Sequence, residues 1–246
     1  MHVLKICLTL LLACNFTNSS AQKKTVDPFE NIIVSPYIKV TFVQGDAESV
    51  MIDDLKVDPD KLHIEVTNNT LHIYLEGAKL IPKNEKEYKN GNTETRPVYE
   101  KTSVTATITY KTLKQLSIRG EEDQFLESPI AGDKFTLHVY GESNVVINKL
   151  DLQQLHTTLY GESVLEIKSG SIRQQRYTCY GESKIDAVAV TGRSSQITAY
   201  GEAEFKLSLS ETMKITSFGD AKVYYKGSPE ISKGLNFGDM SLVQID

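Results

Sequence analysis

The phrase Tyr140-Gly141-Glu142-Ser143 recurs with little change as Tyr160-Gly161-Glu162-Ser163, Tyr180-Gly181-Glu182-Ser183 and Tyr200-Gly201-Glu202-Ala203. Looser copies are Phe218-Gly219-Asp220-Ala221 and Phe237-Gly238-Asp239-Met240, and a degenerate copy, Arg119-Gly120-Glu121-Glu122, precedes them all. Successive glycines of these copies lie 21, 20, 20, 20, 18 and 19 residues apart. A nearly fixed period of this length is typical of a solenoid, in which each repeat forms one coil.

Apolar residues fall into fixed columns when the copies are aligned. The columns are Val139, Leu159, Cys179 and Ala199; Val145, Leu165, Ile185, Phe205 and Val223; and Ile147, Ile167, Ala187 and Leu207. Polar residues alternate with them, as in strands that bury one face. A strand–helix–strand unit takes about 30 residues or more, so the period is too short for one. The sequence therefore predicts an all-β protein, a parallel β-helix with about 20 residues per coil and strands about 4.8 Å apart.

The glycine and the small residue of each phrase suit a corner between two strands. Glycine tolerates positive φ and close approach of another backbone. Ser143 and its equivalents are small enough to turn into a tight corner. We therefore interpret the repeated glycines, Gly161 among them, as structural.

Residues 22–246 are predicted to form a single β-helix domain. Irregular coils are expected over residues 27–112, and regular repeats over residues 113–246. Alternating apolar residues on both sides of Asn68-Asn69 indicate a hairpin or a tight corner there. The alternation stops between residues 77 and 102, where a run of mixed charges over residues 83–92 indicates a polar, disordered loop.

Residues 1–21 have the pattern of an export signal. Lys5 precedes a short apolar run, and Ser19-Ser20-Ala21 provides small residues before a cleavage at Gln22. A second interpretation is a lipoprotein signal, because Leu11-Leu12-Ala13-Cys14 resembles a lipoprotein box with Cys14 as the lipidated residue. Both interpretations predict an exported protein that is periplasmic, outer-membrane-associated or extracellular.

Composition and motifs argue against several classes of function. The chain carries 27 Lys and Arg against 32 Asp and Glu, a net charge of −5, and it has no basic aromatic platform, so nucleic acid is not expected as a partner. It contains no phosphate loop, nucleophile elbow or zinc motif. Cys179 falls in an inward column and is expected to be buried. The histidines share no metal-ligand spacing, and His72 is expected to pair with Glu65 across a hairpin.

The tyrosine and the glutamate of each phrase are predicted to form two outward ladders. A spacing of about 4.8 Å suits offset stacking of aromatic rings. Carboxylates at that spacing repel by about 3.5 kcal/mol at an effective dielectric of 20, so they need solvation, hydrogen bonds or cations such as calcium. Two interpretations stay open: the ladders serve the fold alone, or they form a ligand-binding strip. The strip would consist of Tyr140, Glu142, Tyr160, Glu162, Tyr180, Glu182, Tyr200 and Glu202.

Other segments of the chain carry a resemblance to a known family. They are Pro28-Phe29-Glu30-Asn31-Ile32, Val40-Thr41-Phe42-Val43-Gln44-Gly45, Leu71-His72-Ile73, and Val104-Thr105-Ala106-Thr107-Ile108 with Leu113-Lys114-Gln115-Leu116. Together with the glycine-marked coils they resemble the head GIN domain family, also called putative auto-transporter adhesins, over about residues 27–246. The resemblance implies a single-stranded right-handed β-helix, exported to a Gram-negative envelope, in a family of unestablished function. Tyr-Gly-Glu-Ser departs from the Gly/Ser-rich phrases common in relatives.

These observations favour a non-enzymatic module of the cell envelope, with a binding or structural role and a glycan or cell-surface ligand. No catalytic residue and no cofactor other than calcium is predicted. The alternative is a carbohydrate-active β-helix enzyme that acts on a polysaccharide through some of the outward acids. No polar capping helix follows the last repeat, so self-association through the C-terminal coil is also expected.

Overall fold

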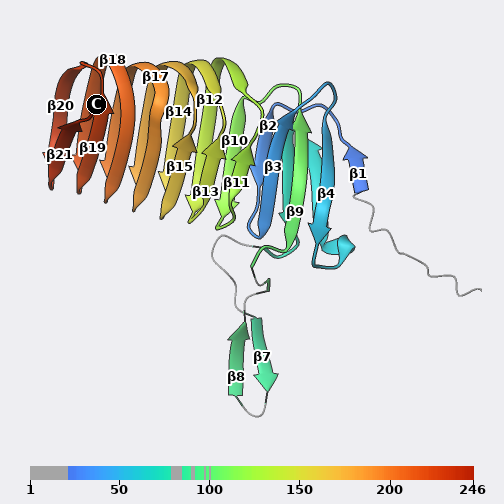
Figure 1. Cartoon of the computed structure of the whole chain (residues 1–246). Coiled ribbons are helices and arrows are strands. Elements are labelled where there is room, and N and C mark those ends of the chain that lie inside the picture. The colour runs from blue at the N-terminus through green and yellow to red at the C-terminus, as the bar shows by residue number, and fades with distance from the viewer. Residues whose placement is uncertain (1–21, 79–84, 90–91, 97, 100) are drawn as a thin grey trace, which may run out of the picture.

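The repeated phrase marks the coils of a β-solenoid. The structure, a computed structural model, describes residues 22–246 except 79–84, 90–91, 97 and 100. Nineteen strands belong to one hydrogen-bonded sheet that winds into the solenoid, and two more form a separate pair (Figure 1). The described residues contain no α-helix, only a short 3-10 turn, η1, at Pro59–Lys61. The predicted all-β solenoid is therefore confirmed.

Two features predicted for the N-terminus are not tested by the structure. The expected signal peptide over residues 1–21 and the lipoprotein box at Cys14 lie outside the described residues. Within the described residues, no helix is both long enough and apolar enough to cross a membrane.

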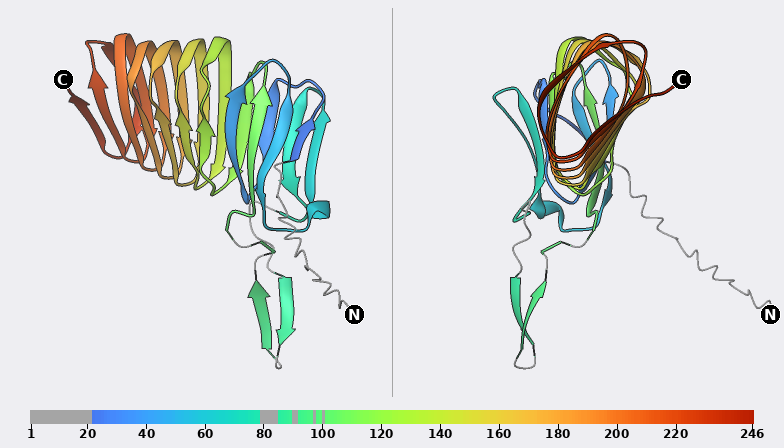
Figure 2. Two further views of the ribbon diagram at one scale, coloured as in Figure 1. Left: turned by 45° about the vertical axis from the view of Figure 1, so that its right-hand side comes forward. Right: turned by 90° about the vertical axis from the view of Figure 1, so that its left-hand side faces the viewer.

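Each regular coil has a long leg that ends in the repeated phrase and a short leg that follows it. Parallel bridges join equivalent residues of successive coils, for example Tyr160 with Tyr180 and Leu165 with Ile185. Seen along the solenoid axis, the coils lie over one another (Figure 2). The strands of this region are β10 (Gln115–Gly120), β11 (Gln124–Leu126), β12 (Ile130–Gly141), β13 (Asn144–Ile147), β14 (Leu150–Tyr160), β15 (Ser163–Ile167), β16 (Gly170–Tyr180), β17 (Ser183–Tyr200), β18 (Ala203–Phe218), β19 (Ala221–Lys226), β20 (Glu230–Phe237) and β21 (Met240–Gln244).

The predicted apolar columns form the core. Val139, Leu159 and their equivalents Cys179 and Ala199 are completely buried, and the columns of the short legs are buried as well. Strands β17 and β18 each run through a short leg and the following long leg, while β12, β14 and β16 are long legs alone. Because the columns repeat in register, the side chains of one coil pack directly on those of the next.

The corner between the legs has the geometry that the glycines predict. Gly161 has a φ of +100°, and a Cβ atom there would lie 2.5 Å from the carbonyl oxygen of Gly141 in the preceding coil. The hydroxyl of Ser163 turns inward and donates a hydrogen bond to the same oxygen at 2.9 Å. Both the backbone conformation and the space therefore require glycine at this position.

The N-terminal strands do not stack in the order of the sequence. Strands β2 and β3 form a coil that pairs with β10 and β11 on one side and with β6 and β9 on the other. The coil of β2 and β3 therefore lies between two other parts of the solenoid. Strands β6 and β9 lie on its outer side, and β10 and β11, which begin the regular repeats, lie on its inner side. The strands of this half are β1 (Gln22–Thr25), β2 (Asn31–Val34), β3 (Ile38–Gln44), β4 (Ser49–Leu55), β5 (Leu62–Thr67), β6 (Thr70–Leu75) and β9 (Val104–Tyr110).

Antiparallel strands cover this N-terminal end of the solenoid. Strand β4 pairs antiparallel with β9 and with β1, and β5 pairs antiparallel with β6. Asn68 and Asn69 connect β5 and β6 with φ values of 50° and 62°, which fits a tight hairpin turn. The hairpin interpretation of Asn68-Asn69 is therefore correct, and residues 27–112 include both irregular coils and a β cap.

The segment expected to be a polar, disordered loop contains a second hairpin. Strands β7 (Glu85–Lys89) and β8 (Asn92–Arg96) pair antiparallel with each other and stand away from the solenoid (Figures 1 and 2). These ten residues thus form a hairpin where a loop without secondary structure was expected. Residues 79–84, 90–91, 97 and 100, to which the prediction of a disordered loop also applies, lie outside the described residues.

The corner geometry predicts a large cost for any side chain at Gly161. Gly161→Ala should lower the free energy of unfolding by about 3 kcal/mol or more, because strain at positive φ adds to a clash with the Gly141 carbonyl. Gly77→Ala is the matched control, since Gly77 has a φ of +76° but no atom within 4 Å of the added Cβ. Its cost should stay at about 1–2 kcal/mol. Equal losses for both variants in denaturant unfolding would contradict the backbone contact.

Candidate functional site

Six aromatic rings form a continuous stack at the ends of the long legs. In-register bridges place each ring over the next, with planes that differ by at most 15°. The centroid distances are 5.0 Å for Tyr140–Tyr160, 4.5 Å for Tyr160–Tyr180, 4.8 Å for Tyr180–Tyr200, 5.1 Å for Tyr200–Phe218 and 5.6 Å for Phe218–Phe237. The tyrosine ladder inferred from the sequence therefore exists, and two phenylalanines extend it.

This stacking decides which parts of the rings a ligand can reach. Nearly parallel rings at such distances cover one another's faces, so the interior rings present their edges and hydroxyl groups outward. Tyr160 and Tyr200 are 38% and 39% exposed. Within the described part of the chain, none of the four tyrosine hydroxyls has a hydrogen-bond partner. A sugar would meet hydroxyls and ring edges here, and it could not lie flat on an interior ring.

A row of threonines, which was not predicted from the sequence, runs beside the aromatic stack. The row consists of Thr158, Thr178, Thr198 and Thr216, which are bridged in register and half-buried. Each lies two residues before the aromatic residue of a phrase, so both side chains point outward from the same leg. No protein group among the described residues hydrogen-bonds their hydroxyls. The aligned repeats contain this signal as a Thr-x-aromatic pattern.

We call the outward surface of the long legs the long-leg face. Its rows are the aromatic stack, the threonine row and a third row two residues further back along each strand. The third row consists of Thr136, His156, Arg176, Gln196 and Lys214. The long-leg face therefore combines hydroxyls, amides and cations on one side of the solenoid.

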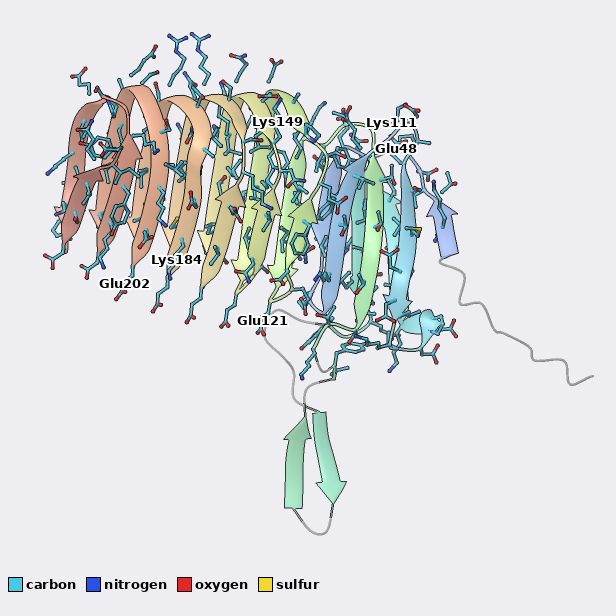
Figure 3. The ribbon with its side chains drawn as sticks, in the orientation of Figure 1. Glu48, Lys111, Glu121, Lys149, Lys184 and Glu202 are labelled. Atoms are coloured by element: carbon cyan, nitrogen blue, oxygen red, sulfur yellow. The ribbon has the colours of Figure 1, made fainter. Side chains whose placement is uncertain are left out.

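The acids of the repeated phrase project from the corner itself. Glu142, Glu162, Glu182 and Glu202 are all exposed. In Figure 3, Glu202 and Glu121 point away from one edge of the solenoid, and Lys149 lies at the opposite edge. Asp220 continues the column, and its carboxylate accepts a hydrogen bond from the backbone N–H of Asp239 at 3.0 Å. Solvation and corner hydrogen bonds thus both reduce the repulsion between the carboxylates of this column.

A shallow groove of about 460 Å³ lies next to the acid column, on the side of the short legs. Its lining is Glu162, Ser163, Val164, Glu182, Ser183, Lys184, Glu202, Ala203, Glu204, Asp220 and Lys222. None of the stacked tyrosines contributes to it. The tyrosines and glutamates of the predicted strip therefore lie on two sides of one corner. The tyrosines lie on the long legs, and the acids lie on the side of the short legs.

Calcium gains no support from the side-chain geometry. Among the residues that the structure describes, no three His, Cys, Asp or Glu side chains come together in a way that could hold a metal ion. Some cationic neighbours are lysines, since Lys206 lies 3.7 Å from the carboxylates of both Asp186 and Glu204. The acids of the short legs are thus compensated partly by the protein.

Two other residues considered from the sequence have structural roles. Cys179 is completely buried, and burial raises the pKa of its thiol to about 12, so it is not a thiolate nucleophile at neutral pH. His72 lies opposite Glu65 in the β5–β6 hairpin, but its Nε2 atom is 2.9 Å from the Ser35 hydroxyl. The Glu65 carboxylate accepts a hydrogen bond from the Tyr74 hydroxyl instead. His72 and Glu65 are therefore cross-strand neighbours, as predicted, but the hydrogen bonds of their side chains go to other residues.

Comparison with known proteins agrees with this architecture. A family model described as "Putative auto-transporter adhesin, head GIN domain" matches residues 28–229. The chain belongs to the head GIN domain family. The family's description indicates a cell-surface or exported protein. Among curated proteins, none matches the chain.

Solved structures of similar proteins share the fold of this head GIN domain. A putative adhesin from Bacteroides fragilis has 19% identity and a TM-score of 0.72, covering 92% of this chain and 96% of its own. One from Parabacteroides merdae has 18% identity and a TM-score of 0.65, with the same coverage. A putative lipid binding protein from Parabacteroides distasonis has 20% identity and a TM-score of 0.62, covering 93% of this chain and 98% of its own. At these identities the likeness extends to the fold alone.

The degenerate copy of the phrase gives the head GIN domain a buried carboxylate. Glu122 takes the place that Ser143 and Ser163 hold in later coils, and it is 8% exposed. Its carboxylate accepts hydrogen bonds from the backbone N–H groups of Tyr37 at 2.9 Å and Glu121 at 3.3 Å. Burial raises the pKa of Glu122 above its usual range, although these hydrogen bonds act in the opposite direction.

The raised pKa predicts how Glu122 affects stability as pH changes. Because the folded pKa exceeds the unfolded one, the folded state favours the proton, and this contribution is lost as pH rises through the folded pKa. Glu122→Gln should therefore melt at a higher temperature than the wild type at about pH 7.5, and the difference should shrink towards about pH 4. The exposed Glu127→Gln serves as the control. A Glu122→Gln variant that is less stable than the wild type at both pH values would contradict this account.

Proposed function

We propose that this head GIN domain protein is an exported cell-envelope module that binds an extended glycan along its long-leg face and does no chemistry on it. The observation that carries the proposal is the pair of parallel hydroxyl rows formed by the stacked tyrosines and the threonines. Parallel pairing fixes the spacing of each row at about 4.8 Å. A rigid array of this kind loses little conformational entropy when it orders a ligand.

The polarity of the surface favours a glycan over an acyl chain. One structural relative carries the description of a lipid binding protein. In this chain, however, the long-leg face offers hydroxyl, amide and cationic side chains, and a site for an apolar ligand is usually a concave pocket lined by apolar residues. The grooves beside the acid column and on the long-leg face, of about 460 and 310 Å³, are lined mostly by polar residues. A polyhydroxylated polymer matches such a surface.

A binding role also agrees with the arrangement of the acids. Hydrolysis of a glycosidic bond commonly needs two carboxyl groups in different environments. Glu162, Glu182 and Glu202 occupy equivalent exposed positions of successive coils. The alternative, a carbohydrate-active enzyme, predicts release of reducing ends when the protein is incubated with a polysaccharide that it binds.

Removal of the hydroxyl rows should weaken glycan binding. Tyr180→Ala and Thr178→Val should each lower affinity about tenfold or more for any soluble polysaccharide that the wild type retains in affinity electrophoresis, because each opens a gap in the middle of a row. Tyr224→Ala is the control, since Tyr224 lies on a short leg. Equal retention of all three variants, or no retention of the wild type by any member of a broad panel, would contradict the proposal.

We also infer that copies of the protein associate through the C-terminal coil. Strands β20 and β21 pair only with β18 and β19 among the described strands, so each has an open edge. Leu235, Phe237 and Val243 are 64%, 63% and 40% exposed there. Open edges with apolar side chains favour pairing with another chain.

A charge at this edge should prevent the association. Leu235→Lys should remain monomeric at concentrations where the wild type forms larger species in sedimentation velocity, because the lysine places a charge in the contact. Val164→Lys is the matched control, as Val164 is 38% exposed but lies in the middle of the solenoid. Wild-type protein that stays monomeric at tens of micromolar would overturn this inference.

A further inference from the structure

The long-leg face is electropositive although the protein as a whole is acidic. The chain has a net charge of −5. Yet no Asp or Glu occupies the outward positions of five successive long legs, which are residues 134, 136, 138 and 140 and their equivalents as far as 218. The same positions hold Lys134, Arg176 and Lys214 together with His138 and His156. The nearest acids lie at the margins of the face.

These marginal acids do not neutralise the face. Asp133 lies near the start of the long leg β12, and Glu230 lies on the last long leg, β20, where it pairs with Thr212. Glu211 is engaged with the guanidinium of Arg193. The remaining acids of the repeats are concentrated at the corner and on the short legs, as in the groove lined by Glu162, Glu182 and Glu202. The solenoid therefore separates its charges onto different sides.

Two cations of the long-leg face, Arg176 and Lys214, line a second groove. It has a volume of about 310 Å³, and its lining includes His156, Arg176 and Lys214. Neither Arg176 nor Lys214 forms an ion pair with a described residue. The register places them two strands apart, a separation of about 10 Å, with the amide of Gln196 between them. Such a separation is comparable to the length of a disaccharide.

We propose that the glycan bound on the long-leg face is acidic, and that Arg176 and Lys214 bind the anionic groups of successive disaccharides. The proposal rests on the proposed function, because it specifies the ligand of the same face. Arg176 can donate two parallel hydrogen bonds to a carboxylate, sulfate or phosphate ester, and Lys214 adds a point charge. The hydroxyls of the same polymer would meet the threonine and tyrosine rows. The acid column repels such a polymer from the short legs, which fixes the side on which it binds.

Other anionic polymers fit the face less well. Single-stranded nucleic acid is usually held by bases that stack on exposed aromatic faces. Here the faces of the interior rings are covered by their neighbours, so the aromatic stack offers no such platform. The geometry therefore favours an acidic polysaccharide, which needs cations and hydroxyls only.

His156 gives an independent report on this site. Burial, followed by the charges of Lys134 and Arg176, lowers the pKa of His156 in the free protein. An anion bound between these cations would offset their effect and raise the pKa of His156. Its titration by NMR distinguishes occupancy of the groove from binding elsewhere on the molecule.

The test compares polysaccharides that differ in charge alone. The probes are polygalacturonate with its methyl ester, and dextran sulfate with dextran. We expect the wild type to bind an acidic member at least tenfold more tightly than its neutral partner, with the pKa of His156 raised in the complex. Arg176→Gln and Lys214→Gln should remove most of this preference. Lys184→Gln, which removes a cation from the groove on the short legs, should retain it.

The outcomes separate this inference from the proposed function. If the neutral and acidic members bind equally and Tyr180→Ala weakens both, the acidic ligand is wrong and the glycan-binding role stands. If none of the four polymers binds, the acidic-glycan inference is overturned, and retention of another polysaccharide decides the proposed function. Tighter binding of single-stranded DNA or of anionic lipid vesicles than of either acidic polysaccharide would overturn the glycan as the ligand class.

Discussion

Contact between the backbones of successive glycine corners sets the geometry of the whole molecule. The Cα of Gly161 approaches the carbonyl of Gly141 so closely that a Cβ would lie 2.5 Å from that oxygen, and Gly181 repeats the relation to Gly161 at 3.0 Å. Because glycine permits this contact, the parallel bridges can hold neighbouring coils in register. Once the register is fixed, any residue type that recurs with the period becomes a straight row on the surface or a column in the core.

The same register gives the solenoid two unlike sides. Acids that follow each glycine collect at the corner, where water and hydrogen bonds reduce the repulsion of about 3.5 kcal/mol expected between neighbours at an effective dielectric of 20. Hydroxyls and cations that precede each glycine collect on the long legs. The glycines separate the two sets by only one residue of backbone. A polymer that approaches from solution therefore meets sides of opposite charge on either side of one edge.

Features that repeat locally could be predicted from the sequence, and features that depend on distant pairing could not. The period, the buried columns and the corner at Gly161 follow from residues about one repeat apart. By contrast, β2 and β3 are inserted between coils formed later in the chain, and contacts such as that of Gln124 with Val40 leave no local signal. The β7–β8 hairpin had a signal in Asn90-Gly91, which its charged surroundings outweighed. The threonine row could have been found in the aligned repeats. The placement of tyrosines and acids on different sides of the corner could not be predicted, because it depends on the direction in which each side chain points.

The hydroxyls of the long-leg face are the part of the structure that folding does not explain. Phe218 and Phe237 stack in the same row as the tyrosines, at 5.1 and 5.6 Å from their neighbours, so the stack forms without a phenolic oxygen. Valine suits a strand as well as threonine does, and the hydroxyl of Thr178 has no partner among the described residues. Groups that recur on four coils and contribute no bond to the protein are available to a ligand. For this reason the proposed binding surface rests on the hydroxyl rows rather than on the aromatic rings themselves.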